Sequence, residues 1–209
     1  MLEVSRQFWT KMISPIAKLF LWIGISPDVV TVVGTLGVSV GALLFFPRGE
    51  FLIGVLIITV FVFSDMIDGM MARSLGKPTK WGAFLDSSLD RIGDAAIFAG
   101  LAMWFAGSGD STLYLAMSLG CLVFGLLTSY TRARAEALGY NAKVGIAERA
   151  DRLVAILVMT AFSQIFDAPI LLEVTLWVLA VASLVTVLQR MVAVRKQFLA
   201  ETAQADGAQ

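Results

Sequence analysis

Long runs of apolar residues, separated by short polar connections, recur along the 209-residue chain. A membrane-spanning helix needs about 20 mostly apolar residues. The stretches that reach or approach this length are 28–47, 51–73, 84–107, 112–135, 150–166 and 170–193. The pattern therefore predicts an all-α, polytopic membrane protein with six transmembrane helices, and an even number of spans places both termini on one side.

The N-terminal segment, residues 1–24, mixes charged and apolar positions. Glu3 and Arg6 stand close to Phe8 and Trp9, a mixture that differs from the basic start and compact apolar core of a cleavable signal peptide. We expect this segment to form an amphipathic helix lying in the membrane interface.

Local signals mark the limits of the bundle. Ser26 can cap the first span, with Pro27 at the first helical position, where the missing N–H has no intrahelical partner to lose. Residues 25–195 are expected to form the bundle, and residues 196–209 a polar tail that frays from about Glu201. No internal repeat is evident, so the whole chain is expected to be a single domain.

Composition and charge support the membrane assignment. Hydrophobic residues make up 58% of the chain and charged residues 15%, with a mean hydropathy of +0.82. The formal net charge is zero, so no general attraction to nucleic acid is expected. The basic residues gather on one side of the predicted topology, at Arg6, Lys11, Lys18, Arg73, Lys77, Lys80, Arg132, Arg134, Lys143, Arg149, Arg152, Arg195 and Lys196. By the positive-inside rule this side, with both termini, faces the cytoplasm from the cell membrane.

Four aspartates interrupt the apolar pattern around the second and third spans. Asp65 and Asp68 are three residues apart, and Asp86 and Asp90 are four apart, so each pair lies on one face of its helix. A short loop joins the two helices, which must run antiparallel and bring both pairs to a similar depth near the cytoplasmic surface. Burying charge costs roughly 2.5 to 3.5 kcal/mol per Asp. A pair of divalent cations would compensate this cost, and oxygen ligands favour Mg²⁺ or Mn²⁺ before Ca²⁺.

Composition also restricts the available chemistry. The chain contains no histidine, so carboxylates must perform any acid–base step. The single cysteine, Cys121, stands in an apolar run and is expected to be a packing residue. Intramembrane acids also mark ion paths, so a divalent-cation transporter is an alternative from a different functional class.

The complete string DMIDGMMARSLGKPTKWGAFLDSSLD, residues 65–90, resembles the signature of the CDP-alcohol phosphotransferase family. Its fixed positions are filled by Asp65, Asp68, Gly69, Ala72, Arg73, Gly82, Asp86 and Asp90. The resemblance implies a homodimeric membrane enzyme that transfers the phosphatidyl group of CDP-diacylglycerol to an alcohol and releases CMP. It also implies that Asp65, Asp68 and Asp86, with Asp90 nearby, hold two Mg²⁺ ions, with Mn²⁺ as an alternative. Asp90 would be the general base that accepts the proton of the alcohol.

The resemblance further implies a site for the cytidine diphosphate. The matching residues are Asp28, Val29, Val30, Thr31, Gly69, Arg73 and Thr79. Helix N-termini and arginine both favour phosphate. Each residue also has a structural interpretation: Asp28 can complement its helix N-terminus, Thr79 can cap a turn, and Arg73 can mark the cytoplasmic boundary.

The segment SYTRARAEALGYNAKVGIAERADR, residues 129–152, is similar to the corresponding region of actinobacterial phosphatidylinositol phosphate synthases within this family. There a basic pocket holds the phosphate of inositol phosphate, and the candidates here are Arg132, Arg134, Arg152 and Arg190. Positive-inside bias explains the same charges without a pocket. Glycerol 3-phosphate, the acceptor of a phosphatidylglycerophosphate synthase, would suit such a pocket equally well. Asp94, one turn beyond Asp90, is expected to be structural.

Overall fold

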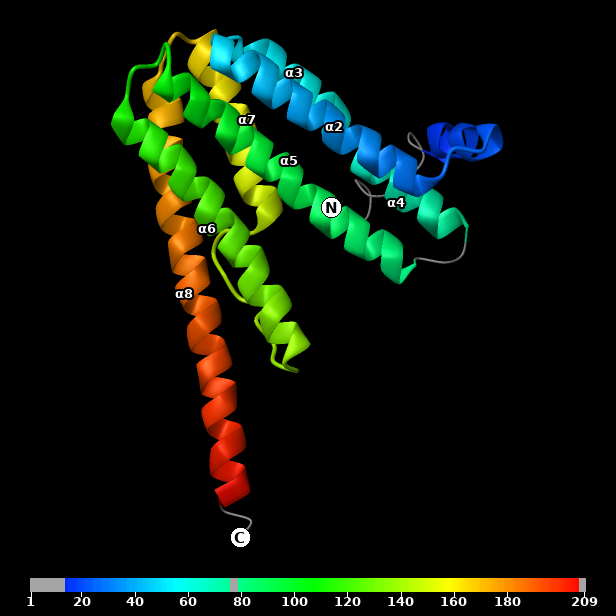
Figure 1. Ribbon diagram of the computed structural model, residues 1–209, viewed down its shortest axis with the longest axis vertical. Coiled ribbons are helices and arrows are strands. Elements are labelled where there is room, and N and C mark those ends of the chain that lie inside the picture. The colour runs from blue at the N-terminus through cyan, green and yellow to red at the C-terminus, as the bar shows by residue number, and fades with distance from the viewer. Residues whose placement is uncertain (1–13, 76–78, 207–209) are drawn as a thin grey trace, which may run out of the picture. The chain divides into compact units, whose positions relative to one another are not determined.

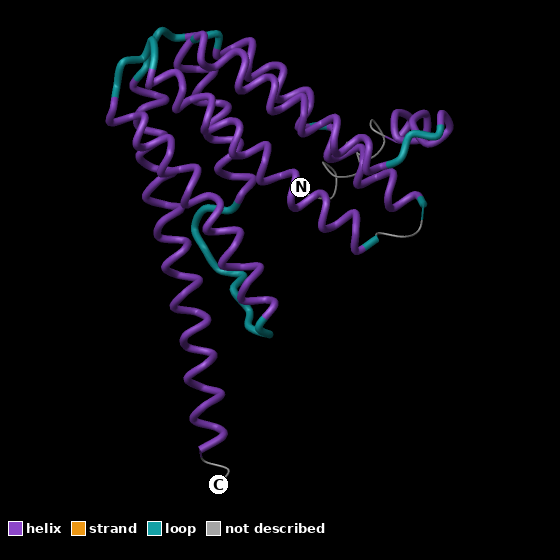
Figure 2. Tube along the Cα trace, in the orientation of Figure 1, coloured by secondary structure: helices purple, strands orange, loops and turns teal. Residues whose placement is uncertain are grey.

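The computed structural model describes residues 14–75 and 79–206, apart from the side chains of Asp65 and Ala205. The described residues form helices joined by loops and turns, without strands (Figure 2). After a helix at Ser14–Ile23, the elements are α2 (Pro27–Phe45), a 3₁₀ turn (Phe46–Arg48), α3 (Phe51–Val62), α4 (Ser64–Ser74), α5 (Lys80–Ala106), α6 (Thr112–Ala137), α7 (Arg149–Ile165) and α8 (Ile170–Asp206). The all-α prediction is confirmed.

The chain divides into two compact units, Met1–Gly100 and Leu101–Gln209. In the first unit, α2 packs along α3 and α4 (Figure 1). The helices approach closely because glycines of α2 face them: a side chain at Gly34 would overlap Ser64, and one at Gly37 would overlap Phe61. Ser26 caps α2 as predicted, accepting a hydrogen bond from the N–H of Val29.

The direction of α5 follows from its contacts with α2. Gly82 lies near Asp28, Gly93 near Val38 and Gly100 near Ala42, so the two helices run parallel. Because α2 runs antiparallel to α3 and α4, α5 is antiparallel to α4, as the short connection predicts.

The described part of the N-terminal segment packs against α2 and α4 within this unit. Ala17 is buried with Val30 of α2 and Met71 of α4, whereas Trp22 on the other face is 84% exposed. Residues 1–13 lie outside the described chain, so the interfacial amphipathic helix stays a prediction.

The predicted second span, 51–73, is divided into two successive helices rather than one. The division falls at Phe63, where the hydroxyl of Ser64 donates to the carbonyl of Phe61 at 2.6 Å and the hydroxyl of Thr59 donates to the carbonyl of Val55 at 2.7 Å. Such side-chain bonds compete with the backbone ladder and bend helices. The acidic motif therefore starts on a helix of its own, α4.

In the second unit, α6 and α7 both pack on α8. Cys121 is buried and donates its thiol to the carbonyl of Leu176, which confirms its packing role. The expected fraying from Glu201 is wrong, because α8 continues to Asp206. Alanine and glutamine favour helix here, and Glu201 accepts a hydrogen bond from Tyr140 of the α6–α7 connection at 3.0 Å.

Within the described residues, four helical stretches are long and apolar enough to cross a membrane: Pro27–Arg48, Phe51–Ser74, Thr112–Ala137 and Ile170–Gln204. They fit a membrane protein. The other two predicted spans correspond to α5, which carries the polar motif, and α7, which has 17 residues and a charged first turn. The count of six therefore stays a prediction.

Candidate active site

The acidic motif occupies two antiparallel helices of the first unit. Asp68 of α4 is only 6% exposed, while Asp86 of α5 is exposed and Asp90 is half-buried. The carboxylates of Asp86 and Asp90 are close enough to act electrostatically on Asp68. The two helices thus bring acids 18 to 22 residues apart in sequence into one charged group, as the spacing predicts. Asp65 lies on α4, and its side chain is outside the described set.

A third helix joins this group through Thr31 of α2. Its hydroxyl donates to Oδ2 of Asp68 at 2.5 Å, in a buried contact. A hydrogen bond to a charged group stabilises that charge and restricts the rotation of the carboxylate. Thr31, assigned from the sequence to the nucleotide site, therefore positions an acid of the motif.

Asp90 has a cationic neighbour on its own helix. Nη1 of Arg91 lies 3.4 Å from Oδ2 of Asp90 and donates to the carbonyl of Ser87 at 2.6 Å. Both contacts use the same nitrogen, Nη1, so one end of the guanidinium places positive charge beside this carboxylate.

The chemistry of this donor set fits a hard divalent cation, because every acidic ligand offers oxygen. Among the described side chains, no three His, Cys, Asp or Glu residues form a compact metal-binding group. Two opposed helices supply Asp68 from one side and Asp86 and Asp90 from the other. Asp65, one turn before Asp68 on α4, is the fourth acid of the motif, and its side chain lies outside the described set.

The residues assigned to the nucleotide lie at the starts of α2 and α5. Asp28 accepts a hydrogen bond from Nε1 of Trp81 at 3.0 Å, which ties these two helix starts together. Thr79 accepts from the N–H of Gly82 at 2.9 Å and so caps the first turn of α5. Sequence reasoning missed Trp81, since its partner is 53 residues away and only its place beside Gly82 of the motif could have indicated it.

The remaining nucleotide candidates divide between surface and core. The guanidinium of Arg73 folds back toward Gly69, one turn earlier on α4, and is exposed. Val29 is exposed, whereas Val30 is buried against Ala17 and Met71. Val30 therefore has a packing role in this structure, and the surface offered to an anion comes from Arg73.

In the second unit, two of the four candidate arginines are buried and share a partner. Arg152 of α7 is 4% exposed and Arg190 of α8 is 7% exposed. Nη1 of Arg152 donates to the hydroxyl of Thr128 at 3.1 Å, and Nη1 of Arg190 donates to the carbonyl of the same residue. Guanidiniums from two helices thus meet at one residue of α6.

The other two arginines lie on the exposed end of α6. Arg132 pairs with Glu136 at 3.0 Å and is close enough to Arg190 to act on its charge. Arg134 lines a cavity of about 430 Å³ together with Arg190 and Arg195; Leu138 and Phe198 contribute to its apolar wall. The four predicted arginines therefore group around Arg190, with two buried and two exposed.

The sequence profile of the CDP-alcohol phosphatidyltransferase family matches residues 24–188, which include parts of both units. The chain is 50% identical to a phosphatidylinositol phosphate synthase of Streptomyces avermitilis, covering 99% of this chain and 85% of the relative. It is also 50% identical to that of Cutibacterium acnes, covering 94% and 98%.

Solved structures agree with these relatives. The phosphatidylinositol phosphate synthase of Mycobacterium tuberculosis with CDP-DAG bound superposes with a TM-score of 0.85 at 41% identity, over 88% of this chain and 94% of that chain. The same enzyme in complex with manganese and citrate gives a TM-score of 0.82, over 87% and 88%. The chain belongs to the CDP-alcohol phosphatidyltransferase family and is an enzyme, which confirms the resemblance of its acidic motif.

Proposed function

We propose that the protein transfers the phosphatidyl group of CDP-diacylglycerol to 1D-myo-inositol 1(3)-phosphate and releases CMP, as a phosphatidylinositol phosphate synthase. The observation that carries the acceptor assignment is the convergence of Arg152 and Arg190 on Thr128. Two buried guanidiniums suit a phosphate group, because arginine forms paired bonds to phosphate oxygens. Free inositol would leave these donors without an anion.

Asp65, Asp68, Asp86 and Asp90 would hold two Mg²⁺ ions. When bound, the ions neutralise the pyrophosphate and stabilise charge on the departing CMP. Buried Asp68, oriented by Thr31, supports this assignment because a preset carboxylate needs little rearrangement to act as a ligand.

Asp90 is the proposed general base. A hydroxyl oxygen of the acceptor attacks the phosphorus of the phosphatidyl group, the phosphorus–oxygen bond to CMP breaks, and the hydroxyl proton passes to Asp90. The guanidinium of Arg91 lies 3.4 Å from Asp90, so a cationic neighbour stands beside the proposed base.

The nucleotide would lie at the starts of α2 and α5. Trp81 ties these two starts together, Thr79 caps the start of α5, and exposed Arg73 is the proposed phosphate contact. The proposed nucleotide set is Asp28, Val29, Val30, Thr31, Gly69, Arg73 and Thr79.

The proposal includes the arrangement in the membrane. The enzyme would be a homodimer that crosses the cell membrane six times, with both termini and the active site cytoplasmic. The distribution of basic residues supports this orientation.

In the test, purified protein receives labelled CDP-diacylglycerol and either inositol 1-phosphate or glycerol 3-phosphate, and CMP release is measured. We expect a kcat/KM at least about ten-fold higher with inositol phosphate, a difference of about 1.4 kcal/mol in transition-state stabilisation. Preference for glycerol 3-phosphate would instead identify a phosphatidylglycerophosphate synthase. Metal flux across sealed vesicles without CMP release would support the transporter.

A further inference from the structure

Thr128 accepts hydrogen bonds from both buried arginines of the second unit, Arg152 and Arg190. Its side chain is 2% exposed, and its hydroxyl donates to the carbonyl of Gly125 at 2.7 Å. This bond uses the single hydroxyl proton, so a lone pair faces Nη1 of Arg152 at 3.1 Å. The carbonyl of Thr128 accepts from Arg190. One residue therefore sets the places of two guanidiniums.

The same two arginines also hold the connection between α6 and α7. Nε of Arg190 donates to the carbonyl of Val144 at 2.9 Å, and Nη1 of Arg152 donates to the carbonyl of Ala147 at 3.2 Å. The N–H of Ala147 in turn donates to the hydroxyl of Thr186 at 3.2 Å. Each guanidinium is thus fixed at two points, by α6 and by this connection, and cannot rotate freely.

Fixing a guanidinium in advance reduces the entropy that is lost when it binds an anion. Arginine has four rotatable bonds, so an unanchored pair would have to be ordered by the ligand itself. The described bonds of Arg190 use Nε and Nη1, and neither uses Nη2. A phosphate that reaches Nη2 would therefore meet a guanidinium whose plane is already oriented by the bonds of Nε and Nη1.

We propose that Thr128 is a positioning residue for the acceptor phosphate, acting chiefly through its hydroxyl on Arg152. The inference rests on the proposed function, because it assumes that Arg152 and Arg190 receive a phosphorylated acceptor. It assigns to a neutral threonine the role of holding Arg152 in the orientation that a phosphate requires.

The test is a set of variants measured for the KM of each substrate separately. Thr128→Val keeps the shape and the carbonyl but removes the hydroxyl, and we expect it to raise the acceptor KM about ten-fold while the KM of CDP-diacylglycerol stays unchanged. Thr128→Ser restores the hydroxyl and should return the acceptor KM to within about two-fold of the wild type.

The matched control is Thr160→Val on α7. Thr160 is fully buried, and its hydroxyl has no hydrogen-bond partner among the described residues. The same substitution there should leave both KM values unchanged. A double-mutant cycle with Arg152→Ala provides the second readout: if Thr128 acts through Arg152, Thr128→Val adds almost nothing in that background. Arg152→Lys serves in the cycle if the alanine variant does not purify as a monodisperse protein.

Three results would overturn the inference. These are equal increases in both KM values with Thr128→Val, no recovery with Thr128→Ser, and an undiminished effect of Thr128→Val in the Arg152 background. If the proposed function itself is wrong, the wild-type protein will prefer another acceptor, a result that none of the variants is needed to detect. The variants are then measured with that acceptor, and the role of Thr128 is tested independently.

Discussion

Asp68 carries its carboxylate at a buried position, where opposing effects act on its charge. Its burial disfavours charge, and the nearby acids Asp86 and Asp90 add repulsion. The 2.5 Å hydrogen bond from Thr31 opposes both effects. At the scale of single residues, the site therefore depends on a neutral hydroxyl from another helix as well as on its acids.

This dependence predicts the effect of Thr31→Val. Removing the hydroxyl leaves the Asp68 carboxylate with one donor fewer, which should weaken metal activation about ten-fold, since a hydrogen bond to a charged group contributes about 1.5 kcal/mol or more. The measurement is the Mg²⁺ concentration that gives half-maximal CMP release. Ser39→Ala, on the same helix, is the control because the Ser39 hydroxyl has no partner among the described residues. An unchanged Mg²⁺ requirement in Thr31→Val would contradict this role.

Asp90→Asn separates the proposed base from the proposed metal ligands. The amide cannot accept the acceptor's proton, so kcat should fall by about 10² or more. Metal affinity, followed by Mn²⁺ binding, should change only a few-fold because Asp65, Asp68 and Asp86 remain. Near-normal turnover would rule out Asp90 as the base.

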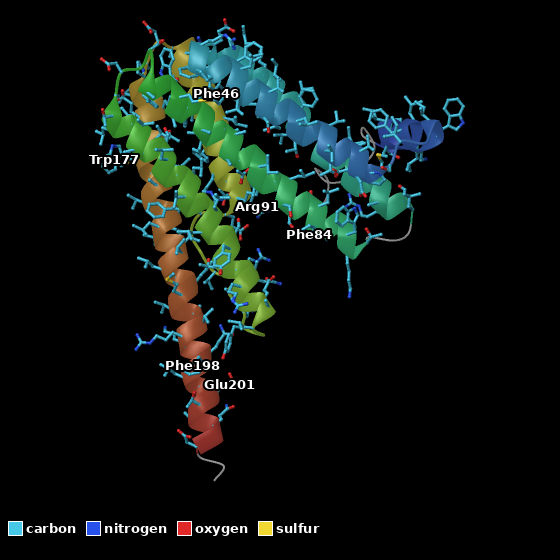
Figure 3. All side chains as sticks on the ribbon, in the orientation of Figure 1. Phe46, Phe84, Arg91, Trp177, Phe198 and Glu201 are labelled. Carbon is cyan, nitrogen blue, oxygen red and sulfur yellow. The ribbon has the colours of Figure 1, made fainter. Side chains whose placement is uncertain are left out.

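At the scale of elements, the α6–α7 connection is held against α8 along its length. Asn141 exchanges two hydrogen bonds with Gln197, at 2.9 and 2.7 Å, and Tyr140 donates to Glu201. Figure 3 shows Glu201 one turn beyond Phe198 near the end of α8. These contacts explain why α8 continues as a helix beyond its apolar part, and they connect the exposed end of the bundle to the buried arginines.

Gly145→Ala tests this element. Gly145 has φ +142°, and a Cβ there would lie 2.3 Å from Cγ2 of Thr186, so the connection must move. We expect a loss of about 1 to 3 kcal/mol in stability, together with a higher acceptor KM because Arg190 bonds the adjacent Val144. Gly139→Ala is the control: its φ is also positive, at +83°, but its Cβ would meet nothing within 4 Å. Equal effects of the two substitutions would show that backbone strain, rather than the contact with Thr186, decides the outcome.

The Tyr140–Glu201 contact has a pH dependence of defined sign. Its hydrogen bond and the nearby Glu201 charge raise the pKa of Tyr140 above the usual 10.0. A raised folded-state pKa means that the contact contributes at pH values below 10 and is lost as the pH rises through the folded value. The difference in tyrosinate absorbance between wild type and Tyr140→Phe should titrate above pH 10. If the absorbance difference instead titrates at pH 10.0, the usual pKa of tyrosine, the contact is absent in solution.

At the scale of the whole molecule, the number of membrane crossings decides the topology. Six spans place Ser108 outside and Lys143 in the cytoplasm. If only the four long apolar stretches crossed, these positions would exchange sides. The single native cysteine, Cys121, is buried, so a thiol reagent should label only the introduced cysteines.

We expect Ser108→Cys, but not Lys143→Cys, to react with a membrane-impermeant thiol reagent in intact cells. Permeabilised cells are the control, because both cysteines should then react. The reverse pattern in intact cells would exclude six spans.

The sequence by itself determined the features that depend on neighbours along the chain. Apolar runs predicted helices, Ser26 and Pro27 predicted the start of α2, and the spacing of the four aspartates predicted their shared faces and the family. Only the tertiary structure decided which distant residues complete each site: Thr31 meets Asp68 37 residues away, Trp81 meets Asp28, and Arg190 meets Thr128 62 residues away. The reason is physical. Helical periodicity is a local property, whereas a hydrogen bond between helices depends on their packing and rotation, which no local pattern contains.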